Sequence, residues 1–218
     1  MMLISPRSIF QIPVLSADIH APSYNPKDTD NFLSVFWLMF FSNLSLQLPM
    51  PVGNDAVPAL LPTPEQRKLI YERIRRFRET KPIFSMDFQN DAEYVGGCIA
   101  GGRRYLHINA AGDVEPCVFI HYSNVNIHEC SLLDALKSPL FMAYHNGQPF
   151  NQNMLRPCPM LENPEYLRKM VKQSGAESTD LQSPESVDHL CDKCKLYAEN
   201  WEKTANELWY ENERQTKS

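Results

Sequence analysis

The chain has 218 residues, of which 43% are hydrophobic, enough for one large domain or two small ones with a real core. Its net charge of −5 argues against a broad basic surface, so we expect no nucleic-acid partner. Six cysteines are too few for a disulfide-dense mini-protein, and we find no secretory signal, so we expect a reducing, cytoplasmic location.

The first part of the chain gives few structural signals. Residues 1–30 contain four prolines and are predicted to form a loop. Residues 31–54 carry no charge, but five polar residues dilute the segment and Pro49 and Pro51 close it. A membrane helix needs about 20 mostly apolar residues. We therefore expect a buried strand or helix here, with a membrane segment as the alternative.

A helix is predicted to follow a proline-rich linker. Thr63 can cap it, Pro64 suits its first position, and Gln66 completes a capping box. The predicted apolar stripe consists of Leu69, Ile70, Ile74 and Phe77. The basic residues are expected to form a solvated face: Arg67, Lys68, Arg73, Arg75, Arg76 and Arg78. With a buried strand at 82–88, the helix makes an αβ unit of the kind found in barrels and layered sheets.

The next part is predicted to contain a hairpin and several helices. "RYLHIN" (104–109) alternates like a strand, "AAGD" supplies the turn, and "VEPCVFI" (114–120) returns. Helices are expected at 131–138, from Pro139, at 164–174 before Gly175, and from about Cys191 to the end. Aromatic and apolar residues on one face of the last helix are expected in the core: Tyr197, Trp201, Ala205, Leu208 and Trp209.

Five cysteines are the candidate metal ligands. They are Cys98, Cys117, Cys158, Cys191 and Cys194. The hairpin should bring Cys98 and Cys117 together, and the flanking prolines stiffen the loop that carries Cys158. The C-x-x-C pair is expected at a helix start, where the amides and dipole stabilise thiolates.

Four thiolates satisfy either a [4Fe–4S] cluster or a tetrahedral zinc ion, so five candidates exceed either need by one. We expect Cys130 to be a structural residue. His107, His121 and His128 lie near the cysteines in sequence and are expected to be packed or hydrogen-bonded residues rather than ligands. The segments around the cysteines promise little continuous apolar core, so metal binding should contribute strongly to folding.

The spacing Cys98-x13-Gly112-x4-Cys117, a later isolated cysteine and a terminal C-x-x-C form a more specific pattern. It resembles the C-terminal auxiliary-cluster region, of SPASM or Twitch type, of radical S-adenosylmethionine proteins. The stretches "MPVGNDA", "LRPCPMLENPE" and "HLCDKCKLYAENW" resemble it as well. The resemblance covers roughly residues 49–210.

The resemblance implies that Cys98 and Cys117 hold one auxiliary iron–sulfur cluster, completed by Cys158 and by Cys191, Cys194 or both. The chain lacks the middle C-x2-C-x5-C-x3-C run of the full SPASM pattern, so one cluster is expected rather than two. It also lacks the C-x3-C-x2-C loop with which this family cleaves S-adenosylmethionine. S-adenosylmethionine is therefore a cofactor only of a complete family member, and we do not expect this chain to cleave it alone.

The implied fold is α+β: a hairpin-plus-helices iron–sulfur domain at 96–218, a remnant of a partial (βα) barrel at 49–95, and a divergent segment at 1–48. The implied partners are an electron donor and a chain that supplies the missing half of the barrel. No acid–base pair stands out, since Asp87, Asp91 and Glu93 can serve as loop caps. Whether the chain is an enzyme, and on what substrate, is left open.

Two other hypotheses stay open on the sequence. The same thiolates suit a structural zinc domain that acts as an interaction module. Alternatively, the chain is a disulfide-bonded or membrane-associated protein that uses residues 31–50 as an anchor.

Overall fold

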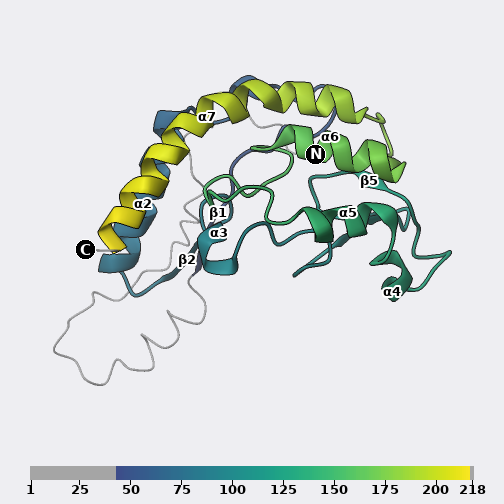
Figure 1. Ribbon diagram of the computed structural model, residues 1–218, viewed down its shortest axis with the longest axis horizontal. Coiled ribbons are helices and arrows are strands. Elements are labelled where there is room, and N and C mark those ends of the chain that lie inside the picture. The colour runs from purple at the N-terminus through teal and green to yellow at the C-terminus, as the bar shows by residue number, and fades with distance from the viewer. Residues whose placement is uncertain (1–42, 217–218) are drawn as a thin grey trace, which may run out of the picture. The chain divides into compact units, whose positions relative to one another are not determined.

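The computed structural model describes residues 43–216, which belong to one compact unit of mixed helix and strand (Figure 1). The helices are α2 (Pro64–Thr80), α3 (Ala92–Val95), α4 (Leu132–Ala135), α5 (Pro139–Gly147), α6 (Pro164–Ser174) and α7 (Val187–Thr216), with a 3-10 turn η3 (Pro58–Leu60). The strands are β1 (Asn43–Leu46), β2 (Phe84–Asp87), β3 (His107–Ile108), β4 (Val114–Glu115), β5 (Tyr122–Ser123) and β6 (Glu177–Ser178). The predicted loop at 1–30 and most of the segment 1–48 lie outside the described residues.

The strands β1 and β2 with the intervening helix α2 form a parallel βαβ unit. Asn43 pairs with Phe84 and Leu46 with Asp87. The αβ unit predicted from the sequence is therefore present, and β1 gives β2 the parallel neighbour that the sequence did not reveal. Within residues 43–216 no third strand joins this sheet, and no barrel closes. The barrel remnant and the boundaries after residues 48 and 95 stay predictions.

Helix α2 begins as predicted. Thr63 accepts a hydrogen bond from the Gln66 N–H at 3.3 Å, and the Gln66 side chain accepts one from the Thr63 N–H at 2.9 Å, which confirms the capping box. The predicted buried stripe is partly wrong, because Leu69 is 45% exposed. The predicted solvated basic face is wrong at Arg67, whose side chain is completely buried.

The hairpin is confirmed in a shorter form, with two residues in each strand. His107 pairs with Glu115 and Ile108 with Val114. Strands β5 and β6 pair in a small sheet that the sequence did not predict. The residues of β6 lie in a polar stretch that was expected to connect two helices. Strands this short have little hydrophobic alternation of their own, so distant backbone partners define them.

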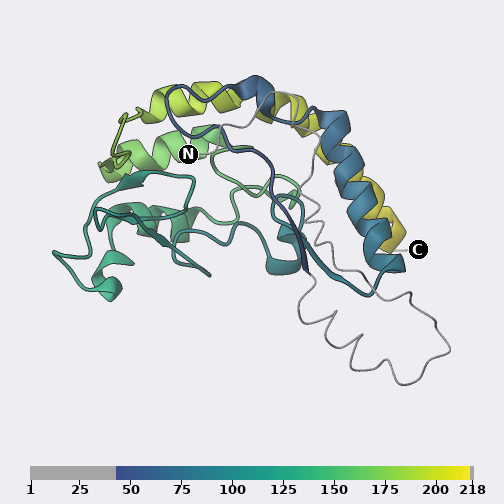
Figure 2. The same ribbon diagram turned by 180° about the vertical axis from the view of Figure 1, so that it is seen from behind.

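The last helix packs against two others. In Figures 1 and 2, α6 runs beside the N-terminal part of α7 and α2 beside its C-terminal part. Trp201, Ala205 and Leu208 of α7 lie in one buried cluster with Tyr71 of α2 and with Leu155, which confirms the predicted core face. No helix among the described residues is long and apolar enough to span a membrane.

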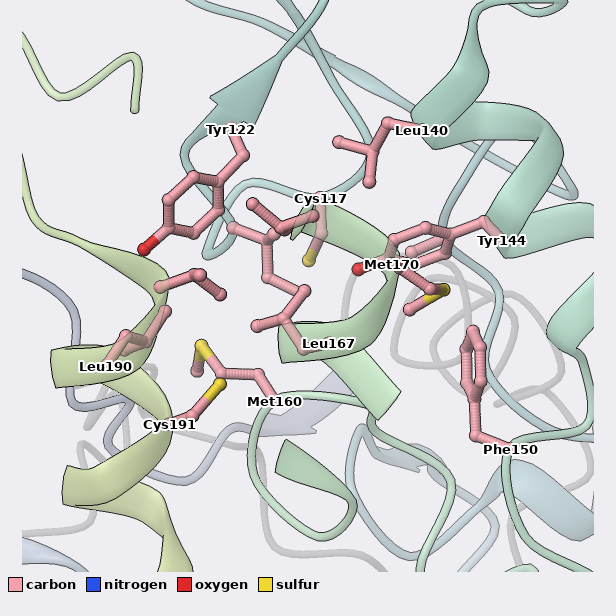
Figure 3. Close-up of a cluster of buried hydrophobic side chains, with 14 of the residues drawn as sticks. Cys117, Tyr122, Leu140, Tyr144, Phe150, Met160, Leu167, Met170, Leu190 and Cys191 are labelled. Atoms are coloured by element: carbon pink, nitrogen blue, oxygen red, sulfur yellow. The ribbon is translucent and has the colours of Figure 1, made fainter. Parts of the chain in front are cut away.

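The largest core cluster lies between α5, α6 and the start of α7 (Figure 3). It includes fully buried Leu140, Met160 and Leu167, to which the loop segments add Ile120 and Phe150. The expectation of little continuous apolar core around the cysteines is therefore wrong. The sequence obscured this core because its members come singly from many short segments rather than from one periodic run.

Candidate metal centre

Cys98 and Cys117 are brought together at the base of the hairpin, as the sequence predicts. The N–H of Gly101 donates to the carbonyl oxygen of Pro116 at 2.9 Å, which joins the backbone beside one cysteine to the backbone beside the other. Cys117 then turns back through an isolated bridge with Ile120. The sulfur of Cys117 is hydrogen-bonded to the hydroxyl of Tyr105 at 2.8 Å.

Cys158 sits in a tight turn that precedes α6. Its carbonyl oxygen accepts the N–H groups of Glu162 and Asn163, at 3.2 and 3.1 Å, and its sulfur accepts the N–H of Leu161 at 3.4 Å. The N–H of Cys158 itself donates to Oε2 of Glu162 at 2.8 Å. The loop therefore holds this cysteine by its backbone on both sides, beyond the stiffness that the flanking prolines provide.

Cys191 and Cys194 are fully buried on α7. The helix begins at Val187, so the prediction that this pair stands at a helix start is wrong. Instead of accepting hydrogen bonds from the free N–H groups of a helix start, the Cys191 thiol donates one to the carbonyl oxygen of Pro164 at 3.1 Å. Burial raises the pKa of both thiols to about 12, the opposite of the thiolate stabilisation that we expected from the helix dipole.

All five predicted ligands belong to the same hydrophobic cluster. Cys117, Cys191 and Cys194 are among its buried members, and Cys98 and Cys158 pack against it. Figure 3 shows Cys117 and Cys191 in this cluster together with Met160, Leu167 and Met170. Cys130 lies elsewhere, packed against the cluster of Val114, Ala135 and Phe141, in agreement with a structural role.

Electrostatic interactions divide the thiols into two neighbouring groups. Burial raises the pKa of Cys158 well above its usual value, and the nearby Cys98 and Cys117 raise it further. In the same way, burial raises the pKa of Cys194 and the neighbouring Cys191 adds to the rise. In the absence of a cation, burial therefore favours the neutral form of these thiols.

The five thiols suit a thiolate-bound metal in their chemistry but do not form a closed coordination shell. Within residues 43–216 no three His, Cys, Asp or Glu side chains are placed to hold a metal ion. A bound metal supplies the positive charge that deprotonates a coordinating thiol. One further group supports the fit: the buried hydroxyl of Tyr144, in the same cluster, has no hydrogen-bond partner in the described part of the chain.

A buried ion pair that the sequence did not predict lies next to the backbone of Cys158, because Glu162 takes part in both contacts. Oε1 of Glu162 accepts a hydrogen bond from Arg67 at 2.7 Å, and neither side chain is exposed. Arg67 also donates to Asn90 at 3.0 Å, and its guanidinium lies 4.2 Å from the centre of the Trp201 ring. Helical periodicity gives a partial signal, because Arg67 lies four and seven residues before Tyr71 and Ile74 and shares their buried face of α2. The carboxylate that compensates its charge comes from a distant segment and could not be predicted from the sequence.

A second polar cluster surrounds the buried carboxylate of Glu115. It accepts hydrogen bonds from Nδ1 of His107 at 2.7 Å and of His121 at 3.1 Å, and from the Thr179 hydroxyl at 2.5 Å. This agrees with the expectation that the two histidines are hydrogen-bonded residues. Asp91 and Glu93 are paired with Arg78 and Arg75 of α2, so they tie the βαβ unit together.

Comparisons with known proteins identify no relative. A scan against protein-family models gives no match to the chain. Comparisons with curated proteins and with solved structures give no significant match either. The likeness to radical S-adenosylmethionine proteins therefore rests on the cysteine spacing and the neighbouring stretches.

Proposed function

We propose that this chain binds one auxiliary iron–sulfur cluster through Cys98, Cys117, Cys158 and the Cys191-x-x-Cys194 pair. One observation carries the proposal: thiols from four separate segments of the chain lie in or against one hydrophobic core cluster. The expected location is the cytoplasm, where such thiols stay reduced.

The protein's own residues supply what a cluster site requires. When bound, an iron–sulfur cluster accepts and releases single electrons. Glu162 fixes the backbone of Cys158, and Tyr105 holds the sulfur of Cys117. Met160 and Leu167, both fully buried, exclude water, which lowers the local dielectric constant and affects the reduction potential. The partner that this chemistry calls for is an electron donor.

The proposal assigns only an auxiliary cluster to this chain. Cleavage of S-adenosylmethionine belongs to the C-x3-C-x2-C loop, which this sequence does not contain.

The test is anaerobic purification followed by metal and sulfide analysis. We expect brown protein with iron and acid-labile sulfide in near-equal amounts and visible absorption that dithionite bleaches. Colourless protein with stoichiometric zinc would replace the proposal with the structural zinc module, since both metals use the same thiolates. Protein without metal after chemical reconstitution would overturn both.

A further inference from the structure

The hydroxyl of Tyr144 is a buried donor without an acceptor. Tyr144 lies on α5 with no exposed surface, and its oxygen has no hydrogen-bond partner among the described residues. Its ring packs edge-on against Phe150 at a centroid distance of 5.4 Å, so the ring itself is well held. Buried tyrosine hydroxyls ordinarily find a partner because an unmade hydrogen bond is costly. A partner is therefore expected that residues 43–216 do not provide.

The surroundings of this hydroxyl indicate what that partner is. In Figure 3 the Tyr144 oxygen points into the core cluster, on the side where the sulfur of Cys117 lies. Burial raises the pKa of Tyr144, and the thiols of Cys98, Cys117 and Cys158 raise it further, which identifies them as its titratable neighbours. The hydroxyl that lacks a partner among the described residues is therefore directed toward Cys117, and Cys98 and Cys158 are among its titratable neighbours.

Gly101 allows this close approach. It has a φ of +68°, and a Cβ at this position would lie 2.6 Å from the Cβ and ring of Tyr144. The N–H of Gly101 also makes the hydrogen bond to Pro116 that joins the Cys98 and Cys117 segments. The same glycine thus brings the two cysteine segments together and admits the tyrosine ring beside them.

Tyr105 supplies a second hydroxyl next to one of the same thiols. Its oxygen is 2.8 Å from the sulfur of Cys117. Tyr105 packs against the core cluster that contains Tyr144. Two phenol groups from different segments of the chain are therefore available at the site. The Tyr105 hydroxyl is hydrogen-bonded to the Cys117 sulfur, and the Tyr144 hydroxyl has no partner among the described residues.

We infer that Tyr144 and Tyr105 donate hydrogen bonds to sulfur atoms of the bound cluster and thereby raise its reduction potential. The inference rests on the proposed function and adds the residues that regulate the site. Reduction adds one electron to the cluster, and the added negative charge resides largely on iron and sulfur. A donor directed at sulfur stabilises the reduced form more than the oxidised form, so the potential rises.

The experiment compares Tyr144→Phe with the matched control Tyr166→Phe. Tyr166 is 48% exposed and packs on the same ring, Phe150, at 6.0 Å, but it belongs to none of the buried core clusters. The measurement is a dithionite titration with redox mediators of reconstituted protein. Tyr144→Phe should lower the ratio of reduced to oxidised cluster about tenfold at a fixed potential, which corresponds to about 59 mV for one electron. Tyr166→Phe should leave it unchanged.

A metal-free measurement separates this role from a structural one. Without the cluster, Tyr144→Phe removes only an unpaired polar atom, so its Tm should equal or exceed that of the wild-type chain. With the cluster bound, the variant should melt at a lower temperature than the wild type. A fall in Tm by the same amount in both forms would show a packing role and overturn the inference.

Failure of the inference and failure of the proposed function give different results. If the wild-type chain takes up no iron and sulfide, the proposed function is wrong. If the wild type and Tyr144→Phe both hold the cluster at equal potential, the inference is wrong and the proposed function stands. Tyr105→Phe provides a second variant: its potential should also fall, and its Fe–S stretching frequencies should shift less in D2O than those of the wild-type chain.

Discussion

The guanidinium of Arg67 and the carboxylate of Glu162 are 2.7 Å apart, and both side chains are completely buried. Arg67 comes from α2 of the βαβ unit, whereas Glu162 lies in the turn that carries Cys158. The ion pair therefore connects the two parts of the described chain at a proposed metal ligand. Burial raises the pKa of Glu162, and Arg67 opposes that rise by stabilising the charged carboxylate.

Replacement of Glu162 by Gln should strongly destabilise the chain. The substitution keeps the volume but leaves the Arg67 charge buried without compensation, which costs about 3–5 kcal/mol when a buried pair is broken. Urea unfolding measures the loss. The double variant Arg67→Met/Glu162→Gln should recover part of it, because the uncompensated charge is gone.

The matched control for this pair is Glu72→Gln. Glu72 pairs with Lys68 on the exposed face of α2, at 3.8 Å, so its loss should cost well below 1 kcal/mol. Equal costs for Glu72→Gln and Glu162→Gln would contradict the role assigned to the buried pair.

Single serine substitutions should separate the metal ligands from the structural cysteine. Cys117→Ser and Cys158→Ser should lose most of the iron after reconstitution, and so should at least one of Cys191→Ser and Cys194→Ser. Cys130→Ser should keep the wild-type content, because Cys130 packs in another cluster. Iron and acid-labile sulfide per chain give the answer. Full iron in Cys158→Ser would remove this residue from the site.

Replacement of Gly101 by Ala should cost more than the same change at Gly175. Both glycines have positive φ, +68° and +66°, so an alanine pays a similar backbone cost at each. The added Cβ meets the Tyr144 ring at 2.6 Å in one case and nothing within 4 Å in the other. Overpacking should add about 1–3 kcal/mol at Gly101. Thermal unfolding of the two variants tests this, and equal Tm values would refute it.

The His121–Glu115 hydrogen bond should make stability fall as the pH rises above neutrality. This bond raises the pKa of His121, although burial opposes it. The stabilisation is complete below the ordinary histidine pKa of about 6.5 and is lost as the pH rises through the raised pKa of the folded state. Burial alone would raise the pKa of Glu115, but bonds from His121, Thr179 and His107 lower it overall. The stability contributed by the charged Glu115 carboxylate is therefore lost only as the pH falls through its lowered pKa.

The test is the Tm measured between about pH 5 and pH 9, on either side of the ordinary histidine pKa. His121→Gln should flatten the decline seen in the wild-type chain over this range. The same substitution at His145, an exposed residue of α5, should leave the decline intact. A decline that survives in His121→Gln would point to another group.

The sequence by itself determined the features that depend on neighbours in the chain. Thr63 and Gln66 could be predicted as a capping box because the bonds span three residues, and Gly175 could be predicted to end α6 because its φ of +66° favours glycine. The cysteine spacing predicted a metal site built from Cys98, Cys117, Cys158 and one or both of Cys191 and Cys194. All five lie in or against one core cluster, although within residues 43–216 no three of them are placed to hold a metal ion.

Only the tertiary structure decided which side chains are buried and what they meet. Arg67 shares a helix face with Tyr71 and Ile74, but the partners that allow its charge to be buried, Glu162 and Trp201, reach it from distant segments. Tyr144 and Gly101 show no joint pattern in the sequence, and only the fold places the Tyr144 ring where a Cβ at Gly101 would lie 2.6 Å from it. The physical reason is that burial and charge pairing depend on distances in space, which local propensities do not encode.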